Sequence, residues 1–150
     1  MFRTLAGLVL VSWMLFSQGR PLIRSAERQI GFHLRLPRDL PSGFRLTQVD
    51  VSTESDRLKN SVRLIYTGRT GIIEMNEYLH PMELVPNEGD SVETTIVDGQ
   101  QITVVTTHPT AANSPVFPAT TATIEVKGVY IQVTGMNISK EEVLKVIRSF

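Results

Sequence analysis

Short runs rich in β-branched residues dominate the chain between residues 44 and 134, and turn residues such as glycine, proline and aspartate separate them. Apolar and polar residues alternate along most of these runs, which would give each strand one apolar face. The short connections favour antiparallel neighbours, because parallel strands need long crossovers. The pattern predicts one curved antiparallel sheet of about seven strands, at residues 44–54, 61–68, 71–79, 91–97, 100–107, 120–127 and 129–135.

Two reversals predict which strands are neighbours. The segment from Gly68 to Gly71 has the composition of a turn between the second and third strands. Lys127-Gly128 suits a two-residue hairpin loop, which would bring apolar residues together on one face. The expected pairs are Val126 with Val129, Ile124 with Ile131 and Ala122 with Val133.

A third reversal lies at Val97-Asp98-Gly99. Glycine tolerates the left-handed backbone conformation that a three-residue hairpin loop requires at its last position. We therefore predict a three-residue loop here. The expected pairs are Ile96 with Gln100, Thr94 with Ile102 and Val92 with Val104.

The chain closes with a segment of helical spacing. Ser139 and Glu142 form a capping box, and an apolar stripe follows them. The stripe consists of Val143, Leu144, Ile147 and Phe150. A helix of this kind needs an apolar surface to cover, so we expect it to pack on one face of the sheet, which gives the α+β class.

Residues 20–43 are predicted to be a linker that leads into the folded domain at residues 44–150. Arg24 to Ile30 could form a short helix, with Ser25 as its cap and Gly31 as its end. Pro37 and Pro41 then exclude regular structure until the first strand.

The start of the chain, residues 1–19, carries an export-like pattern. Arg3 precedes an uncharged run from Leu5 to Phe16, and small residues follow at Ser17 and Gly19. The run is shorter than the roughly 20 apolar residues of a membrane-spanning helix, which favours a cleaved signal peptide. A membrane anchor formed by an N-terminal apolar helix is the alternative, and it would allow membrane association through residues 5–16. Both place the domain outside the cytoplasm, secreted or tethered to the cell membrane. A third reading is a buried helix of a soluble domain, because uncharged runs of this length can also be core helices.

Composition excludes several function classes. Fifteen basic and fifteen acidic residues cancel, so no excess of positive charge favours nucleic acid as a partner. The chain has no cysteine, which removes disulfides, thiolate nucleophiles and cysteine metal sites. We expect no cofactor and no metal.

No local catalytic signature is present. The sequence lacks a nucleophile elbow, a zinc-protease helix, a P-loop and a dinucleotide-binding glycine pattern. His33, His80 and His108 are isolated along the chain, and Glu74 and Glu77 should point to opposite faces of their strand. We therefore predict that the protein is not an enzyme and assign no catalytic residue.

One long loop stands out as a candidate contact for a ligand or a partner. Residues 107–119 are rich in proline, alanine and serine but include Val116 and Phe117. Long ordered loops often carry function, so this apolar pair could cover a ligand or meet a partner. The alternative is that the pair anchors the loop in the core.

Two segments resemble a bacterial family, the DUF4367 domain. The segment Gly31 to Phe44 (GFHLRLPRDLPSGF) is similar to the opening of that family, and Val129 to Ser139 (VYIQVTGMNIS) with the terminal Ile147 to Phe150 is similar to its last strand and helix. The resemblance implies an extracytoplasmic α+β domain of uncharacterised function, found in single-span proteins, sometimes beside anti-sigma-factor regions. It implies no catalytic residue.

These observations together predict a non-enzymatic sensing or binding module of a bacterial envelope protein, whose partner would be a protein or a small apolar ligand. Two alternatives belong to other classes. One is a carrier of an apolar ligand such as a lipid or lipoprotein, in a cavity between sheet and helix. The other is a hydrolase whose site is assembled from scattered polar residues, which would need a cleft in which a histidine and a carboxylate meet within hydrogen-bonding distance.

Overall fold

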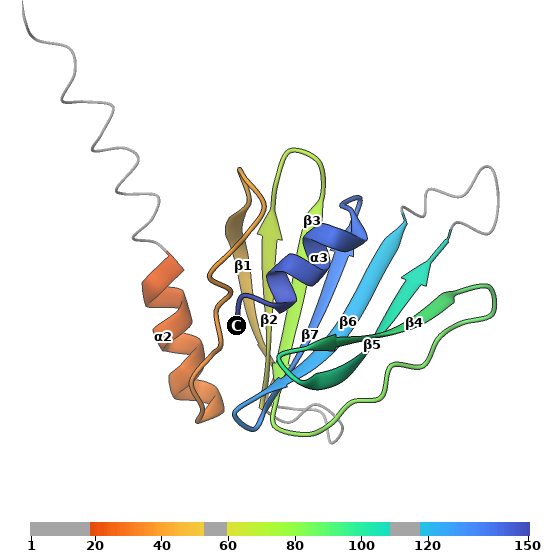
Figure 1. The fold of residues 1–150 in the computed structure, drawn as a ribbon. Helices are drawn as coiled ribbons and strands as arrows, with labels where there is room; N and C mark the ends of the chain where they lie inside the picture. The colour runs from red at the N-terminus through yellow and green to blue at the C-terminus, as the bar shows by residue number, and fades with distance from the viewer. Residues whose placement is uncertain (1–18, 53–59, 109–117) are drawn as a thin grey trace, which may run out of the picture.

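The computed structural model describes residues 19–52, 60–108 and 118–150, which form two helices and seven strands around one core (Figure 1). The elements are α2 (Gly19–Ile30), β1 (Arg45–Ser52), β2 (Ser61–Thr67), β3 (Ile72–Tyr78), β4 (Ser91–Val97), β5 (Gln100–Thr107), β6 (Ala119–Val126), β7 (Val129–Met136) and α3 (Lys140–Ile147).

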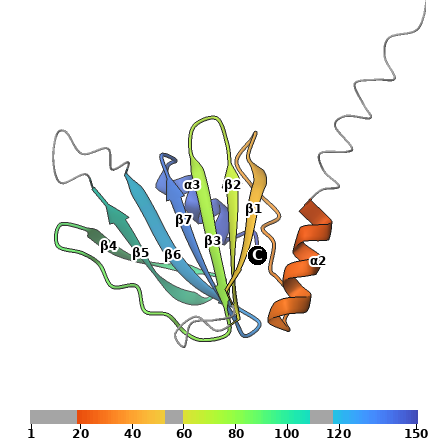
Figure 2. The ribbon, with the colours of Figure 1, turned by 180° about the vertical axis from the view of Figure 1, so that it is seen from behind.

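All seven strands belong to one sheet of order β1-β2-β3-β7-β6-β5-β4, and every neighbouring pair is antiparallel. The chain builds β1 to β3, passes to the far edge at β4, and returns strand by strand until β7 lies beside β3 (Figure 2). This arrangement confirms the predicted α+β class with a seven-stranded antiparallel sheet.

The sheet is strongly curved at the β4–β5 end. Pairing between β5 and β6 covers only Val104 to Thr107, and beyond it the side chain of Gln100 bonds the backbone of Glu125 in place of a ladder partner. Lys140 Nζ lies 2.9 Å from Glu93 Oε2, an ion pair that joins α3 to β4. The sheet therefore wraps partly around α3, as Figure 1 shows.

The predicted register of the β6–β7 hairpin is confirmed. Val126 pairs with Val129, Ile124 with Ile131 and Ala122 with Val133. Both loop residues, Lys127 and Gly128, have positive φ angles, and a turn of this hand matches the twist of the flanking strands.

The predicted register of the β4–β5 hairpin is wrong by one residue. Asp98 and Gly99 both have positive φ and form a two-residue loop, so Val97 pairs with Gln100 and Ile96 with Gln101. Because side chains alternate between faces, this shift buries Val97 and leaves Ile96 70% exposed. Aspartate tolerates the left-handed region, which makes Asp98-Gly99 as good a two-residue turn as Lys127-Gly128.

The C-terminal helix forms as predicted. Ser139 accepts a hydrogen bond from the backbone N–H of Glu142, and the Glu142 carboxylate accepts one from the backbone of Ser139. Val143, Val146 and Ile147 are fully buried against β6 and β7. The interface beneath α3 is therefore a filled core.

Helix α2 is longer than predicted, and Ser25 lies inside it instead of capping it. The reason is a buried stripe of Ile23, Ala26 and Ile30 at helical spacing, which packs on β1 and β2 and favours helix upstream of Arg24. The end at Gly31 is confirmed, since its φ is +79° and its N–H donates to the backbone carbonyl of Glu27.

The segment that follows, residues 31–44, is named the strap here. It has no regular structure, as its prolines predict, and it crosses from the end of α2 to the start of β1 (Figure 1). Leu34 is buried in the core, and Leu40 and Phe44 pack against it. Residues 20–43, predicted as a linker, thus contribute side chains to the core of the domain.

Several predictions fall outside the described residues, namely the apolar run 5–16 and the loop residues Val116 and Phe117. Neither α2 nor α3, the helices of the described part of the chain, has the length and apolar character that a membrane crossing requires.

Candidate functional site

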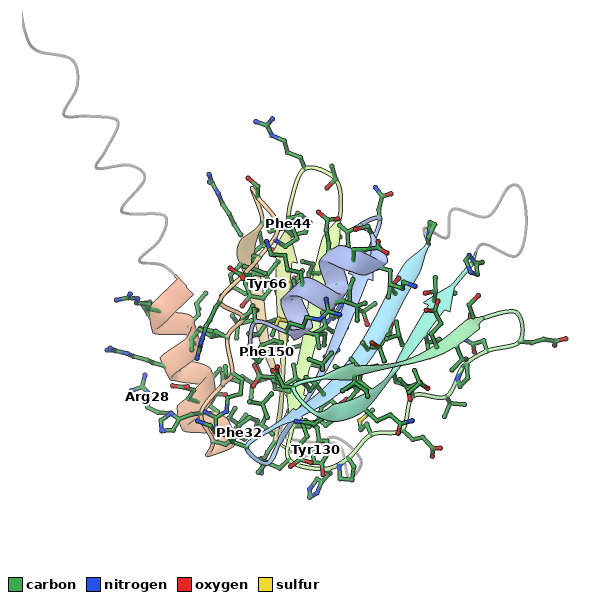
Figure 3. All side chains as sticks on the ribbon, in the orientation of Figure 1. Arg28, Phe32, Phe44, Tyr66, Tyr130 and Phe150 are labelled. Carbon is green, nitrogen blue, oxygen red and sulfur yellow. The ribbon has the colours of Figure 1, made fainter. Side chains whose placement is uncertain are left out.

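A pocket of about 480 Å³ lies between α2, the strap and the first two strands. Its apolar lining consists of Ile23 from α2, Leu36, Pro37, Leu40 and Phe44 from the strap, Leu46 from β1 and Tyr66 from β2. Figure 3 shows Phe44 and Tyr66 over the first strands, in the interval between α2 and α3. Small-molecule sites typically measure about 300–1,000 Å³ and are mostly apolar, so the pocket has the size and lining of a binding site.

Two carboxylates hold the strap that forms one wall of the pocket. Glu27 of α2 accepts the backbone N–H of Leu34 at 3.0 Å, and Glu77 of β3 accepts that of Arg35 at 2.8 Å. Farther along, the backbone N–H of Arg38 donates to the carbonyl of Ser149 at 3.4 Å. The position of the strap thus depends on α2, the sheet and the C-terminus together.

Glu77 is an unusual residue for a strand core. Its side chain has 0% exposure, and among the described residues its Oε1 has no hydrogen-bond partner. Burial raises the pKa of Glu77 to about 8, because the hydrogen bond and charge of Arg35 offset only part of the lost hydration, and the negative charge of Glu27 adds to the rise. At neutral pH the carboxyl group is therefore mostly protonated.

Tyr66 provides a polar group in the apolar part of the pocket. It is only 5% exposed, and within the described part of the chain its hydroxyl makes no hydrogen bond. Burial raises the pKa of Tyr66 well above its usual value, and the nearby Glu77 contributes to the rise. The neutral phenol is therefore a hydrogen-bond donor that faces the pocket.

Positive charge surrounds the pocket opening. Arg20 and Arg24 of α2 and Arg45 of β1 line it, against one carboxylate, Glu27. All three arginines are exposed, and no described carboxylate forms a salt bridge with any of them.

A second hollow, of about 980 Å³, lies along the outer side of α2. Its described lining comes only from α2 and the first strap residues, including Arg28, Phe32 and His33. Figure 3 shows Arg28 pointing away from the sheet. Among the described residues this hollow has no wall from the sheet. The pocket between α2, the strap and the first two strands is therefore the better candidate site.

The three histidines do not come together with one another. His33 Nδ1 lies 3.4 Å from Glu27 Oε1 but its side chain is exposed, and His108 bonds Ser91 at 3.1 Å. His80 is exposed after β3. Across the three described ranges, no group of three or more histidine, aspartate or glutamate side chains could hold a metal.

Glu74 and Glu77 lie on opposite faces of β3, as predicted. Glu74 bonds Arg63 at 2.7 Å on the exposed face, whereas Glu77 faces the core. Sequence reasoning missed the role of Glu77, although a signal was present. Ile73, Met75 and Glu77 alternate along one strand, so the apolar face that holds Ile73 and Met75 also holds Glu77.

The comparisons with known proteins give one family. The sequence matches the model of a family described as a domain of unknown function, DUF4367, over residues 36–150. No curated protein and no solved structure matches the chain. The matched span contains all seven strands, α3 and most of the strap, whereas the α2 wall of the pocket precedes it. Residues 31–44, 129–139 and 147–150 predicted this family by their resemblance to it. Because the match covers well over half of the sequence, the chain belongs to the DUF4367 family.

Proposed function

We propose that this chain is a non-enzymatic, extracytoplasmic binding module of a bacterial envelope protein, and that its ligand occupies the pocket between α2 and the sheet. The observation that carries the proposal is the apolar pocket, whose lining includes Tyr66 with a hydroxyl that makes no hydrogen bond within the described residues. The export-like run at residues 5–16 supports the compartment.

Helix α2 gives this module a way to report occupancy. It packs on β1 and β2, it forms one wall of the pocket, and it directly follows residues 1–18 in the chain. A ligand that contacts both α2 and the sheet would stabilise their packing, since it binds best when both walls are in place. The sensing role follows from this coupling.

Photocrosslinking tests the pocket. The full chain would be treated with an apolar alkyl diazirine, and the labelled peptides would be mapped by mass spectrometry. We expect label on peptides that contain Ile23, Leu40 and Leu46. Leu40→Trp should fill the pocket and reduce this label several-fold, whereas Leu79→Trp, at an exposed position after β3, should leave it unchanged. Equal labelling of these peptides in all three proteins would exclude the pocket as the site.

A carrier of an apolar ligand such as a lipid is the second candidate. The apolar lining of a cavity between sheet and helix favours it, although the helix is α2 and not α3. A carrier releases its ligand to an acceptor, so the protein should accelerate transfer of a fluorescent fatty acid between two vesicle populations. A sensing module would bind the same molecule without accelerating its transfer.

The compartment has its own test. The full chain would be expressed in a bacterial host, and its intact mass and cell fraction would be determined. A soluble exported species that begins near Arg20 would indicate a secreted domain, and a full-length membrane-bound species would indicate a tethered one. Recovery of only full-length protein in the cytoplasm would contradict the proposed localisation.

A further inference from the structure

We infer that the pocket binds a single-chain anionic amphiphile, with its alkyl chain among Ile23, Leu40 and Leu46 and its carboxylate or phosphate at Arg24 and Arg45. This inference rests on the proposed function and names the chemical class of the ligand. The apolar lining explains the chain, and the polar groups of the same pocket explain the head.

The polar groups that line the pocket are mainly donors. Arginine guanidinium groups donate and cannot accept, and the Tyr66 hydroxyl donates as well. Three arginines and one tyrosine therefore face a ligand with acceptor oxygens. Carboxylates and phosphates match the guanidinium fork, which binds their oxygens in pairs.

Among the described residues of the lining the single carboxylate is already engaged. Glu27 Oε1 accepts the backbone N–H of Leu34 at 3.0 Å and lies 3.4 Å from His33 Nδ1. Its bonds hold the strap, and its one negative charge faces three positive charges in the described lining, so Glu27 neutralises the arginines only in part. The whole chain has equal numbers of basic and acidic residues, which makes the positive charge at this opening a local feature.

The hydroxyl of Tyr66 is an independent observation. Tyr66 is only 5% exposed and lines the pocket, and its hydroxyl makes no hydrogen bond within the described residues. When a ligand fills the pocket and displaces water, a donor left without an acceptor costs free energy. A ligand oxygen within the pocket would supply the missing acceptor. An unsubstituted alkane would leave the donor without one.

The size of the pocket limits the ligand to one chain. About 480 Å³ lies in the lower half of the range for small-molecule sites, which is about 300–1,000 Å³. A phospholipid with two long acyl chains would not fit inside the described walls. A fatty acid or an alkyl phosphate would.

Calorimetric titration of the full chain tests the inference with four probes of equal chain length: decanoate, decyl phosphate, decanol and decyltrimethylammonium. We expect one or both anions to bind at least about tenfold more tightly than decanol, the gain typical of a charge-assisted hydrogen bond. The cation should bind most weakly. The better of the two anions identifies the head group as carboxylate or phosphate.

The variants locate the head group. Arg24→Gln with Arg45→Gln should weaken anion binding about tenfold and leave decanol binding unchanged. The control, Arg28→Gln with Arg69→Gln, removes the same charge at exposed positions outside the pocket and should change neither. Tyr66→Phe should weaken the anions as well, with the fold checked by circular dichroism.

Three results would overturn the inference, and they differ in meaning. Decanol binding as tightly as both anions would refute the anionic head while the proposed function stands. Equal loss in both arginine pairs would show a general charge effect instead of a head-group site. Absence of binding by all four probes would refute the proposed pocket function itself.

Discussion

The carboxyl group of Glu77 has its pKa raised to about 8, whereas an unfolded glutamate titrates near 4.5. Between these values the folded state holds a proton that the unfolded state has lost. Stability must therefore decrease as pH rises through this window, and the contribution of the protonated carboxyl group is fully present only below pH 4.5. Glu77 thus makes the free energy of unfolding depend on pH.

Glu77→Gln should remove this dependence. Glutamine is neutral at every pH, and its amide oxygen can still accept the Arg35 N–H. We expect the two proteins to have similar free energies of unfolding near pH 4.5, and the variant to be more stable above pH 8 by on the order of 5 kcal/mol. Urea unfolding across this range provides the measurement. Parallel stability curves for the two proteins would show that Glu77 does not titrate in this window.

Gly135 on β7 lets α3 approach the sheet closely. A Cβ atom at this position would overlap the side chains of Val143 and Ile138. We expect Gly135→Ala to reduce the free energy of unfolding by about 1–3 kcal/mol, the usual cost of overpacking a core.

A double-mutant cycle separates overpacking from other effects of this alanine. In the Val143→Ala background the overlap with Val143 is removed while that with Ile138 remains, so Gly135→Ala should cost less there than in the wild type. Chemical denaturation of the four proteins measures the coupling. Additive effects would mean that the Gly135 methyl group does not contact α3.

At the level of the elements, α3 depends on its capping box. Ser139→Ala removes the acceptor for the Glu142 N–H and should reduce the free energy of unfolding by about 1 kcal/mol. Ser139→Asp keeps an acceptor oxygen and should retain most of the stability. Thermal denaturation of both variants tests this, and equal losses would show that the hydroxyl contact does not stabilise the helix.

The strands and α3 were predictable because their signals are local. The hairpin of β6 and β7 places matching apolar residues on one face only when its loop has two residues, so pattern and turn agree. In the hairpin of β4 and β5 the alternation allowed two registers, and the positive φ angles at Asp98 and Gly99 decided between them. The Asp-Gly pair is itself a signal for a two-residue turn, but the prediction gave it less weight than a three-residue loop.

The pocket was not predictable at this level. A cavity between sheet and helix was among the sequence-based alternatives, but its residues come from α2, the strap and two strands. They meet only through packing at long range. The extent of α2 was missed for a related reason, since Ile23, Ala26 and Ile30 support a helix only when β1 and β2 cover their stripe.

The molecule as a whole has two unequal packing regions. Beneath α3 the sheet is covered by fully buried side chains, whereas α2 and the strap cover β1 and β2 around an open pocket. Regions with fewer buried contacts open at lower free energy than the global core. Helix α2 and the strap, which form one side of the pocket, should therefore open before the rest of the fold.

Hydrogen exchange resolves this difference along the chain. We expect the amides of α2 to exchange faster than those of β3 and β7, which pair at the centre of the sheet. Ile30→Ala should accelerate exchange in α2 and leave β7 nearly unchanged, because local opening does not require the sheet to unfold. The matched core change, Val133→Ala on β7, should accelerate exchange in β3 and β7, whose amides require global unfolding, and leave α2 nearly unchanged. A common exchange rate for α2 and β7 in all three proteins would mean that α2 unfolds only with the whole domain. In that case α2 could not move separately from the sheet and could not report whether the pocket is occupied.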